Sequence, residues 1–357
     1  MAERAERLLA LLTEAQLDLL LISALVNVRY LTGYTGSNGL AVVGPQTRTF
    51  VTDFRYVEQA AAEVQAGYDR RQEAVDLIEA VPGVLPAGPV RLGFDDGALS
   101  VRQHARLREL LPDRVELVAA GGLVERLRVV KDAQEVGRIR AAAALADDAL
   151  AELLGAGLSG RTEHELARAL TRAMEARGGE GPSFAPIVAA GAHGALPHAQ
   201  PREVAVEDGQ LVVIDWGVKL DGYCSDCTRT VAVGGASERA REVYELVLAA
   251  QQAGLAAVRA GAGARAVDGI ARELIAAGGH GEHFGHSLGH GVGLEVHEAP
   301  RVSQRSDEEL ESGMVVTIEP GIYLPGELGV RIEDLVVVTD AGCEVLTGLD
   351  KSLMSVG

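Results

Sequence analysis

The sequence is poor in cysteine and in positive charge, and it lacks long hydrophobic runs. Three cysteines in 357 residues cannot form a disulfide framework. Lysine and arginine number 33 against 51 acidic residues, a net charge of −18, which excludes a general nucleic-acid binder because phosphate contacts need clustered cations. No run of about 18 or more apolar residues occurs, and the N-terminal stretch mixes charges with leucines, so neither a membrane span nor a signal peptide is expected. We expect a cytoplasmic protein that binds neither nucleic acid nor a membrane.

The length and the apolar content predict two domains. A chain of 357 residues with 47% hydrophobic residues exceeds one typical domain and can build a sizeable core. Helix and strand patterns alternate at its start, with a helix expected over 3–16 and strands at 18–23 and 47–53. We therefore expect an α/β domain over 1–125 and a second domain over 126–357.

The second domain begins with two helical segments. Apolar residues recur at helical spacing across 127–157, where Asp132 is the expected N-cap, and again across 161–179. Helices are expected a second time around 237–260 and 265–277. The same scheme of helices followed by strands thus occurs twice.

The stretch from Gly313 to Thr339 has the pattern of two strands joined by a turn. β-Branched residues run into Glu319 and out again past Glu333, with a PGELG cluster between them. Gly326 is equidistant from both glutamates, so an antiparallel hairpin places them opposite each other with Cβ atoms roughly 5 Å apart. Facing carboxylates in apolar surroundings repel unless a cation lies between them. The pair therefore indicates a metal site.

A second stretch, EDGQLVVIDWGVKLDGYCSDCTRTVAV, repeats this pattern. Its carboxylates, Asp215 and Asp226, flank the KLDG turn at equal distances along the chain and are expected to face each other. Aligning the two stretches places Asp215 on Glu319, 104 positions later, and the same shift places Gly157 on Gly261. A repeat of this size predicts two halves related by a pseudo-twofold axis, with the two carboxylate hairpins as mates.

Five of the nine histidines lie in one stretch, GHGEHFGHSLGHGVGLEVHEAP. Such a stretch can be a flexible loop that binds metal weakly. Val292, Leu294 and Val296 alternate among glycines, however, which is typical of a buried strand that another segment approaches closely. We therefore expect an ordered strand here.

Two other patterns are interpreted as structural. Cys224 and Cys227 form a C-x-x-C pattern, but residues three apart on a strand point to opposite faces, and no second C-x-x-C follows. We interpret both as packing residues that flank Asp226. Asp53 and Arg55 could form a site, although such residues more often cap a helix or pair at the surface.

Six motifs occur in a fixed order: ALPHAQP, VIDWG, YCSDCTRT, GHGVGLEVHEAP, TIEPGIY and RIED. Together they resemble the Xaa-Pro peptidases, prolidase and aminopeptidase P, of the pita-bread metallopeptidases. The resemblance covers the second domain and, more weakly, the first. It implies a creatinase-type α/β N-terminal domain over 1–125 and an α+β pita-bread catalytic domain, with its internal pseudo-twofold repeat, over 126–357.

The resemblance also implies the site residues. The ligands of its two metal ions match Asp215, Asp226, His290, Glu319 and Glu333. Its catalytic histidines match His198 and His297. Residues that line the site, hold the substrate or orient a ligand match His286, Arg301 and Arg331.

The ligand types indicate the chemistry. Four carboxylates and one imidazole suit hard or borderline ions, so we expect Mn²⁺, with Co²⁺ or Zn²⁺ as alternatives. Two such ions activate a water and stabilise the developing oxyanion. Glu319 is the candidate to carry the proton from that water to the leaving prolyl nitrogen. His198 and His297 are expected to donate hydrogen bonds to the tetrahedral intermediate.

The expected function is that of an Xaa-Pro dipeptidase. Arg301 resembles the arginine with which prolidases hold the free carboxylate of the terminal proline, although a plain surface arginine is the alternative. Aminopeptidase P activity on longer peptides is the alternative function. A non-catalytic binding module and a metal-free, creatinase-like hydrolase are disfavoured because the ligand set, His198 and His297 are all present. The resemblance implies proline-containing di- or oligopeptides as substrates and a homodimer.

Overall fold

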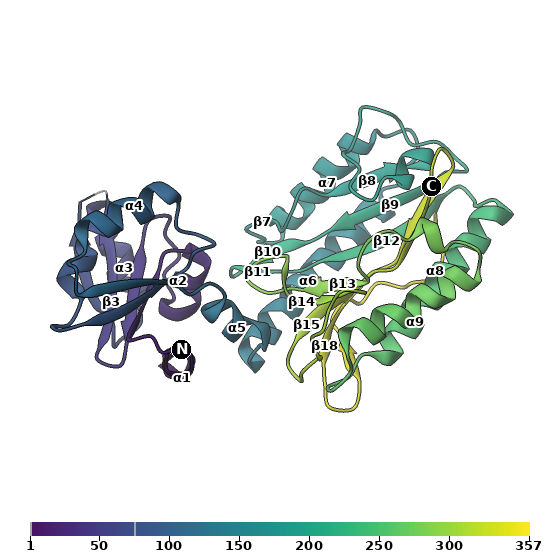
Figure 1. Ribbon diagram of the computed structural model, residues 1–357. Helices are drawn as coiled ribbons and strands as arrows, with labels where there is room; N and C mark the ends of the chain where they lie inside the picture. The colour runs from purple at the N-terminus through teal and green to yellow at the C-terminus, as the bar shows by residue number, and fades with distance from the viewer. Residues whose placement is uncertain (1, 75) are drawn as a thin grey trace. The chain divides into compact units, whose positions relative to one another are not determined.

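The computed structural model describes residues 2–74 and 76–357, and the chain forms two compact units, Met1–Arg128 and Val129–Gly357 (Figure 1). Helix α5 (Leu123–Val129) spans the junction between them. Buried apolar clusters lie within each unit. The units are therefore described separately.

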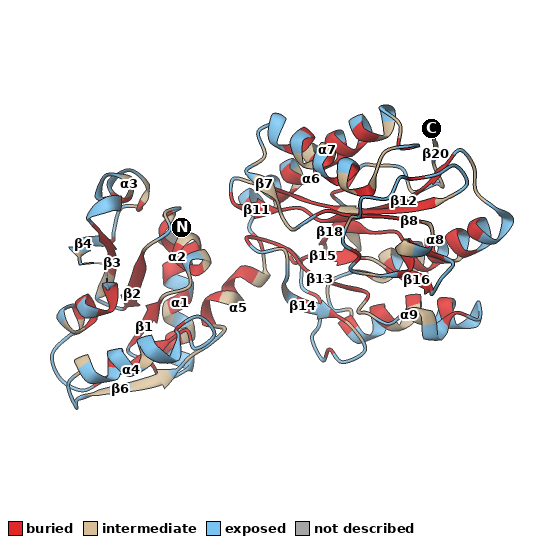
Figure 2. Cartoon of the chain, turned by 90° about the horizontal axis from the view of Figure 1, so that it is seen from above, coloured by how far each residue is buried: buried red, intermediate tan, exposed pale blue. Residues whose placement is uncertain are grey.

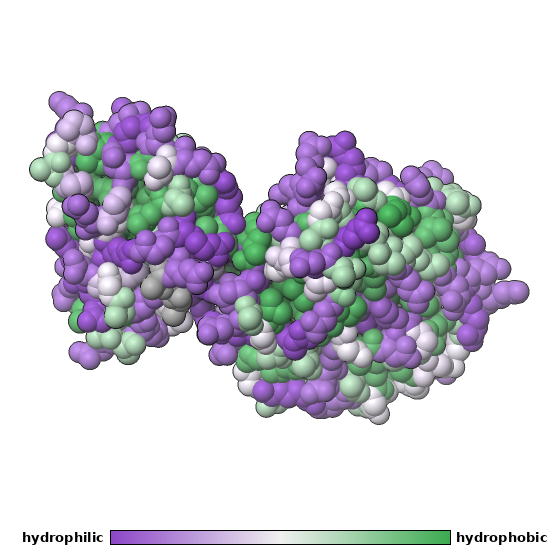
Figure 3. Space-filling view, turned by 90° about the horizontal axis from the view of Figure 1, so that it is seen from below, coloured by the Kyte–Doolittle hydropathy of each residue, from purple (hydrophilic) through white to green (hydrophobic). Residues whose placement is uncertain are grey.

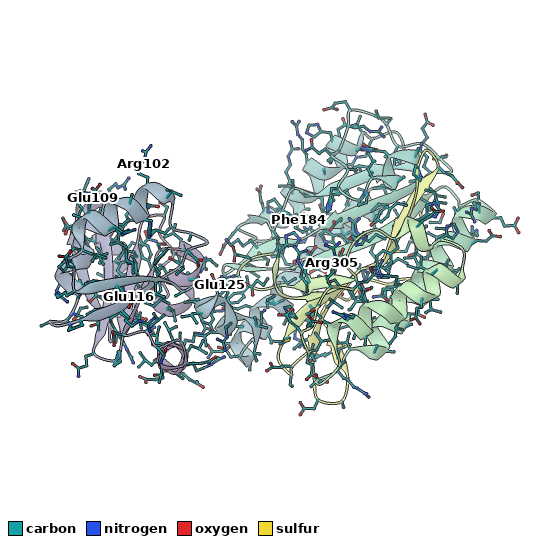
Figure 4. All side chains as sticks on the ribbon, in the orientation of Figure 1. Arg102, Glu109, Glu116, Glu125, Phe184 and Arg305 are labelled. Atoms are coloured by element: carbon teal, nitrogen blue, oxygen red, sulfur yellow. The ribbon has the colours of Figure 1, made fainter. Side chains whose placement is uncertain are left out.

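The N-terminal unit is built on one mixed six-stranded sheet, in the order β4-β3-β2-β1-β5-β6. Its elements before α5 are α1 (Ala2–Glu14), β1 (Leu19–Ile22), α2 (Leu25–Thr32), β2 (Leu40–Gly44), β3 (Thr47–Asp53), η1 (Phe54–Tyr56), α3 (Val57–Glu63), β4 (Asp69–Glu73), η2 (Leu77–Val84), β5 (Val90–Phe94), α4 (Val101–Leu110) and β6 (Val115–Ala119). The buried strand β1 lies inside the sheet, antiparallel to β2 and parallel to β5. On α4, Arg102 and Glu109 are exposed and point away from the unit (Figure 4).

Local sequence signals explain which elements of this unit were predicted and which were not. The expected first helix and the strands at 18–23 and 47–53 are present. Helix α2 was not predicted: its N-cap, Ala24, makes no side-chain cap, so the usual start signal is missing. Asp53 caps η1 and pairs with Arg55 at 2.8 Å, which confirms the structural interpretation of these two residues.

The C-terminal unit holds two larger sheets, in the orders β20-β12-β9-β8 and β14-β13-β15-β18-β19. Its elements are α6 (Ala133–Gly155), α7 (Glu163–Ala176), β7 (Gly181–Pro182), β8 (Ile187–Ala190), η3 (Gly191–Ala195), β9 (Leu211–Trp216), β10 (Val218–Leu220), β11 (Tyr223–Cys224), β12 (Cys227–Val233), α8 (Glu238–Ala257), α9 (Ala264–Ala277), η4 (Gly281–His283), β13 (Gly289–Gly291), β14 (Glu298–Val302), β15 (Val315–Ile318), β16 (Gly321–Leu324), β17 (Leu328–Arg331), β18 (Asp334–Val338), β19 (Cys343–Val345) and β20 (Ser355–Val356). The expected helices are all present, and Asp132 caps α6 in a capping box with Glu135.

Each of these sheets packs one face on its own pair of helices. Val212, Ile214 and Trp216 of β9 are buried in a cluster with α6 and α7, and Val316 and Ile318 of β15 are buried in a cluster with α8 and α9. Figure 2 shows the result, with buried strands and with helices that have one buried and one exposed side. Successive side chains on a strand alternate between its faces, so the residues between these apolar ones face away from the helices.

The candidate ligand carboxylates lie on these strands or directly next to them. They occupy the alternate positions, between the apolar residues that face the helices. They are Asp215 on β9, Asp226 before β12, Glu319 after β15 and Glu333 before β18. Alternation therefore turns all of them toward the inner faces of the two sheets, away from the helices.

The predicted register of the second hairpin is confirmed. Ile318 pairs with Asp334 at the end of the β15–β18 ladder, and β16 and β17 continue the same register from Gly321 opposite Arg331. Glu319 and Glu333 occupy opposed positions between these two ladders.

The predicted pairing of the first hairpin is wrong by two positions. Asp215 lies opposite Thr228, not opposite Asp226. The reason is the turn: Asp221 and Gly222 have φ values of +49° and +80°, as in a two-residue hairpin turn with both central residues left-handed. That turn fixes the register, and the two aspartates become diagonal neighbours.

The internal repeat appears in the order of the elements. The helix pair α6–α7 precedes β8, β9 and β12, and the pair α8–α9 precedes β13, β15 and β18, which neighbour one another in the same way. Gly157 and Gly261 have φ values of +79° and +78°, and Gly209 and Gly313 have +88° and +91°. The backbone thus takes the same unusual conformation at positions 104 apart. The predicted fold class is confirmed.

Hydrophilic residues lie among hydrophobic ones over both units on the face drawn in Figure 3. In residues 2–74 and 76–357, no helix combines the length and the apolar content that crossing a bilayer would require.

Candidate metal centre and active site

The candidate ligands converge between the inner faces of the two sheets. His290 Nε2 lies 3.5 Å from Asp226 Oδ2 and 3.3 Å from Glu319 Oε1. Potential ligand atoms of Asp226, His290 and Glu333 lie within 4.8 Å of one another. Asp215 is close enough for its charge to shift the pKa values of the other three carboxylates. The structure therefore brings together five residues that are far apart in sequence.

The unpaired atoms at this centre fit a cation. Asp215 Oδ1 and Glu333 Oε1 are buried and have no hydrogen-bond partner among the described residues. Buried polar oxygens are normally paired. His290 Nδ1 lies 3.1 Å from the carbonyl oxygen of Gly291, so Nδ1 donates there and the Nε2 lone pair faces the carboxylates. Carboxylate oxygens and one imidazole nitrogen are a donor set for divalent ions such as Mn²⁺.

The electrostatics of the centre lead to the same conclusion. Burial raises the pKa of Asp226 well above its usual range, and the charges of Glu333 and Asp215 raise it further. Burial, followed by the charges of Glu319 and Asp215, likewise raises the pKa of Glu333. Burial also raises the pKa of Glu319 and lowers that of His290. Carboxylates in such a cluster ionise together only when positive charge compensates them.

Hydroxyl groups that the sequence analysis did not single out hold two of these carboxylates. Thr228 Oγ1 donates to Glu333 Oε2 at 2.7 Å, and Thr317 Oγ1 donates to Glu319 Oε1 at 3.1 Å. Thr228 stands two positions after Asp226, and Thr317 two before Glu319. Strand alternation places each threonine on the ligand face, and this spacing was the available signal.

Arg331 is committed to internal contacts. Its Nη2 donates to Asp215 Oδ2 at 2.6 Å, its Nε to Thr228 Oγ1 at 3.0 Å, and its Nη1 to Tyr323 Oη at 2.9 Å and to the carbonyl oxygen of Pro197 at 3.1 Å. The residue is only 3% exposed. This placement favours a role in orienting Asp215 over direct substrate contact.

Tyr323, also not singled out by sequence, connects Arg331 to His286. The Tyr323 hydroxyl lies 2.9 Å from His286 Nε2, while His286 Nδ1 donates to the carbonyl oxygen of Ser287 at 2.8 Å. Burial is the main reason that the pKa of His286 lies below its usual value. His286 is therefore held as a neutral ring at one side of the centre.

The two candidate catalytic histidines lie at the open side of the site. His198, after η3, and His297, before β14, are both exposed, whereas the side chains of Asp226 and Glu333 are almost fully buried. The rings of His297 and His290 are 4.4 Å apart between centroids. Burial, followed by the charges of His290 and Arg301, lowers the pKa of His297.

Arg301 is placed to reach the same side. It lies opposite His290 in the β13–β14 ladder, and cross-strand partners project from the same face. Arg301 is exposed, and its guanidinium forms no salt bridge with the residues that the structure describes. It is therefore available to a ligand.

The histidine-rich stretch is ordered, but its expected strand is wrong. The chain bends between β13 and β14, and Val292 and Leu294 are buried within this bend. The close approach is present: a Cβ on Gly289 would come within 1.9 Å of the Thr317 carbonyl oxygen, and one on Gly291 within 2.1 Å of that of Ala299. These contacts, and a register shift after His290, replace a longer strand.

The C-x-x-C pattern is structural, as predicted. Cys224 and Cys227 are free and buried, and burial raises the pKa of both thiols. Neither sulfur is part of the ligand cluster.

Comparisons with known proteins agree with this geometry. Residues 137–340 match metallopeptidase family M24, and residues 4–130 match the creatinase/prolidase N-terminal domain. An Xaa-Pro dipeptidase of Pyrococcus furiosus is 36% identical, over 99% of this chain and 100% of that protein.

Solved structures are similar over nearly the whole chain. An Xaa-Pro dipeptidase from Bacillus anthracis superposes with a TM-score of 0.95 at 40% identity, covering 99% of each chain. An X-Pro aminopeptidase from Thermotoga maritima MSB8 superposes with a TM-score of 0.91 at 36% identity, covering 99% of this chain and 100% of the other. The chain thus belongs to metallopeptidase family M24, with an N-terminal domain of the creatinase/prolidase type.

Proposed function

We propose that the protein is an Xaa-Pro dipeptidase that uses two divalent metal ions to hydrolyse the bond between an N-terminal residue and the following proline. The observation that carries this proposal is the inward-facing set of four carboxylates and His290, with buried unpaired oxygens on Asp215 and Glu333. The Xaa-Pro dipeptidases among its relatives support the substrate class.

The ligand set supports Mn²⁺ as the ion. Asp215, Asp226, His290, Glu319 and Glu333 would hold two ions, and Co²⁺ or Zn²⁺ could replace Mn²⁺. When bound, such ions supply Lewis-acid polarisation of the scissile carbonyl and a water of lowered pKa. All other roles fall to side chains of the chain itself.

Glu319 is proposed to move the proton. Burial raises the pKa of its carboxyl, so the group can take a proton from the attacking water and release it to the prolyl nitrogen. Transfer to that nitrogen is required because an unprotonated amide nitrogen is a poor leaving group. Thr317 holds one Glu319 oxygen at 3.1 Å and so fixes the orientation of the carboxylate.

His198 and His297 are proposed to stabilise the transition state from the open side. Neutral imidazoles can each donate one hydrogen bond to the developing oxyanion. The lowered pKa of His297 keeps its ring neutral near neutral pH. The exposure of both residues, compared with the buried ligands, leaves the substrate an approach on this side.

Arg301 is proposed to hold the carboxylate of the terminal proline. An exposed guanidinium opposite His290 can form a bidentate contact with a substrate carboxylate. A dipeptide places its carboxylate one residue beyond the scissile bond, whereas a longer peptide has an amide there. This contact favours dipeptides over the substrates of aminopeptidase P.

Side-by-side hydrolysis of Ala-Pro and Ala-Pro-Ala, with Mn²⁺ added to chelator-treated protein, tests the proposal. Faster turnover of Ala-Pro supports a dipeptidase. Preference for the tripeptide would assign the activity to aminopeptidase P, and turnover of neither would leave a binding role for the fold. A homodimer and a cytoplasmic location stay predictions, and light scattering and cell fractionation would test them.

A further inference from the structure

The segment that carries His198 runs from Ala190, at the end of β8, to Arg202. Apart from the short helix η3 it has no regular structure, and His198 is exposed. A group that donates a hydrogen bond to a reacting atom must be held to within a fraction of an ångström. Other residues must therefore fix this segment.

One buried carboxylate accepts hydrogen bonds from both ends of the segment. Glu163, at the start of α7, accepts hydrogen bonds from Ala190 N at 2.9 Å and from His193 Nδ1 at 2.9 Å. It also accepts from Arg202 three times, from N at 2.9 Å, Nε at 3.1 Å and Nη2 at 3.0 Å. The Glu163 side chain is 0% exposed. The residues that it binds bracket His198 on both sides.

These bonds keep Glu163 ionised in spite of its burial. Burial alone acts to raise its pKa, but hydrogen bonds from Arg202, from Ala190 N and from His193 outweigh it, and the pKa lies below the usual value. A buried charge without such partners would be strongly destabilising. The buried charge of Glu163 therefore depends on the hydrogen bonds that this segment donates.

The middle of the segment is fixed from the other side. Arg331 Nη1 donates to the carbonyl oxygen of Pro197, the residue before His198. Gly194 lies so close to β17 that a Cβ on Gly329 would come within 1.8 Å of the Gly194 carbonyl oxygen. The same Arg331 binds Asp215, so one side chain connects the segment to a candidate ligand of the metal centre.

We propose that Glu163 is a positioning residue for catalysis: by holding Ala190, His193 and Arg202 it sets the place of His198 relative to the metal centre. The inference rests on the proposed function in one respect, the catalytic role of His198. Among the described residues, the Glu163 carboxylate hydrogen-bonds to Ala190, His193 and Arg202 and to none of the proposed metal ligands, so its effect on catalysis passes through the segment.

A double-mutant cycle with Ala-Pro as substrate tests the inference. Glu163→Gln removes the charge while keeping the size, and His198→Ala removes the imidazole. We expect E163Q to lower kcat by about tenfold to a hundredfold, as small misplacements of catalytic groups do, with bound metal and KM little changed. In the H198A background, E163Q should have almost no further effect, because the group that it positions is gone.

Glu165→Gln is the matched control. Glu165 lies two residues further along the same helix and is exposed. Within 2–74 and 76–357, its carboxylate accepts one hydrogen bond, the capping-box bond from Thr162 N, which glutamine can also accept. E165Q should leave kcat within about twofold of the parent. Glu163→Asp, which keeps the charge on a shorter arm, should recover part of the loss.

The outcomes separate the inference from the proposed function. Wild-type kcat in E163Q, or equal losses from E163Q with and without His198, would overturn the inference. Wild-type activity in H198A would overturn the role of His198 and, with it, this inference. If E163Q does not fold, Arg202→Met replaces it in the same cycle with the same criteria, because Arg202 is partly exposed and its side chain contributes two of the bonds to Glu163.

Discussion

The first hairpin of the C-terminal unit (β9–β12) closes on a two-residue turn, whereas the second (β15–β18) extends through β16 and β17 before it turns. Asp215 and Asp226 are therefore 11 positions apart and diagonal, while Glu319 and Glu333 are 14 apart and directly opposed. Both hairpins nevertheless present two carboxylates to one centre. The face of the sheet on which each carboxylate lies is therefore the same in the two halves, whereas the pairing register and the side-chain length differ.

The support of the ligands crosses between the halves. Arg331, from the second hairpin, holds Asp215 of the first, and Thr228, from the first hairpin, holds Glu333 of the second. Each half thus orients a proposed ligand that belongs to the other. The halves therefore depend on each other, although their elements follow the same order.

The largest loss of activity is expected from single substitutions that remove one proposed ligand, either in the first half or in the second. Asp226→Asn and Glu333→Gln should each lower kcat/KM by more than about a hundredfold, because losing a ligand exceeds the usual cost of losing an outer hydrogen bond to a ligand. Each should also reduce the metal bound per chain, measured by elemental analysis. Glu207→Gln, an exposed change in the first half, is the control. Retained metal in either variant would show that this half does not contribute to the centre.

A smaller effect is expected from the crossed supports. Arg331→Lys should lower kcat/KM by about tenfold to a hundredfold, because an ammonium cannot bind Asp215, Thr228 and Tyr323 together. Thr228→Val, which removes one neutral hydrogen bond to Glu333, should cost less, about 0.5–1.5 kcal/mol or up to about tenfold. Kinetics of both variants at saturating Mn²⁺ would measure the difference between the two losses of kcat/KM. A larger loss in T228V than in R331K would contradict it.

Arg301 lies in the second half and is proposed to bind the carboxylate of the substrate. Arg301→Ala should slow Ala-Pro hydrolysis by about tenfold to a hundredfold, since a charge-assisted contact contributes about 1.5–3 kcal/mol. Ala-Pro-Ala should be much less affected, and Arg301→Lys should recover only part of the loss. Equal slowing of both substrates would make Arg301 structural.

The sequence predicted the parts of the site that depend on strand periodicity and on local turns. Glu319 and Glu333 were placed opposite each other because Gly326 marks the turn. The aspartate pair was misplaced because the turn at Asp221 and Gly222 sets the register, and its centre is not midway between the aspartates.

Contacts across sheets and loops could not be predicted in the same way. The bonds of Arg331 to Pro197 and of Thr228 to Glu333 join residues more than 100 positions apart, and no local pattern encodes such distances. The bend after His290 replaced the expected strand because glycines admit close backbone contacts there. The ligand residues themselves were assembled through the family resemblance.

The smallest effect is expected on the pH dependence of stability in chelator-treated protein, to which one carboxyl of each half, Asp226 and Glu333, contributes. The pKa values of Asp226 and Glu333 are raised in the folded state, above unfolded values of about 4. Each carboxyl therefore contributes stability that is present below about pH 4 and is lost as the pH rises through its folded-state pKa.

Metal binding replaces those protons. The gap in Tm between Mn²⁺-loaded and chelator-treated protein should therefore widen as the pH rises from 5 to 8, and it should narrow in both D226N and E333Q. Thermal unfolding at several pH values would measure this gap. A gap that is constant with pH would contradict the raised pKa values.

The most direct test of the account is the number of metal ions per chain, measured together with activity on Ala-Pro. Two Mn²⁺ ions per chain are expected in the active protein, with loss of hydrolysis on chelation and recovery when Mn²⁺ is restored. Full hydrolysis by protein shown to be free of metal would contradict it.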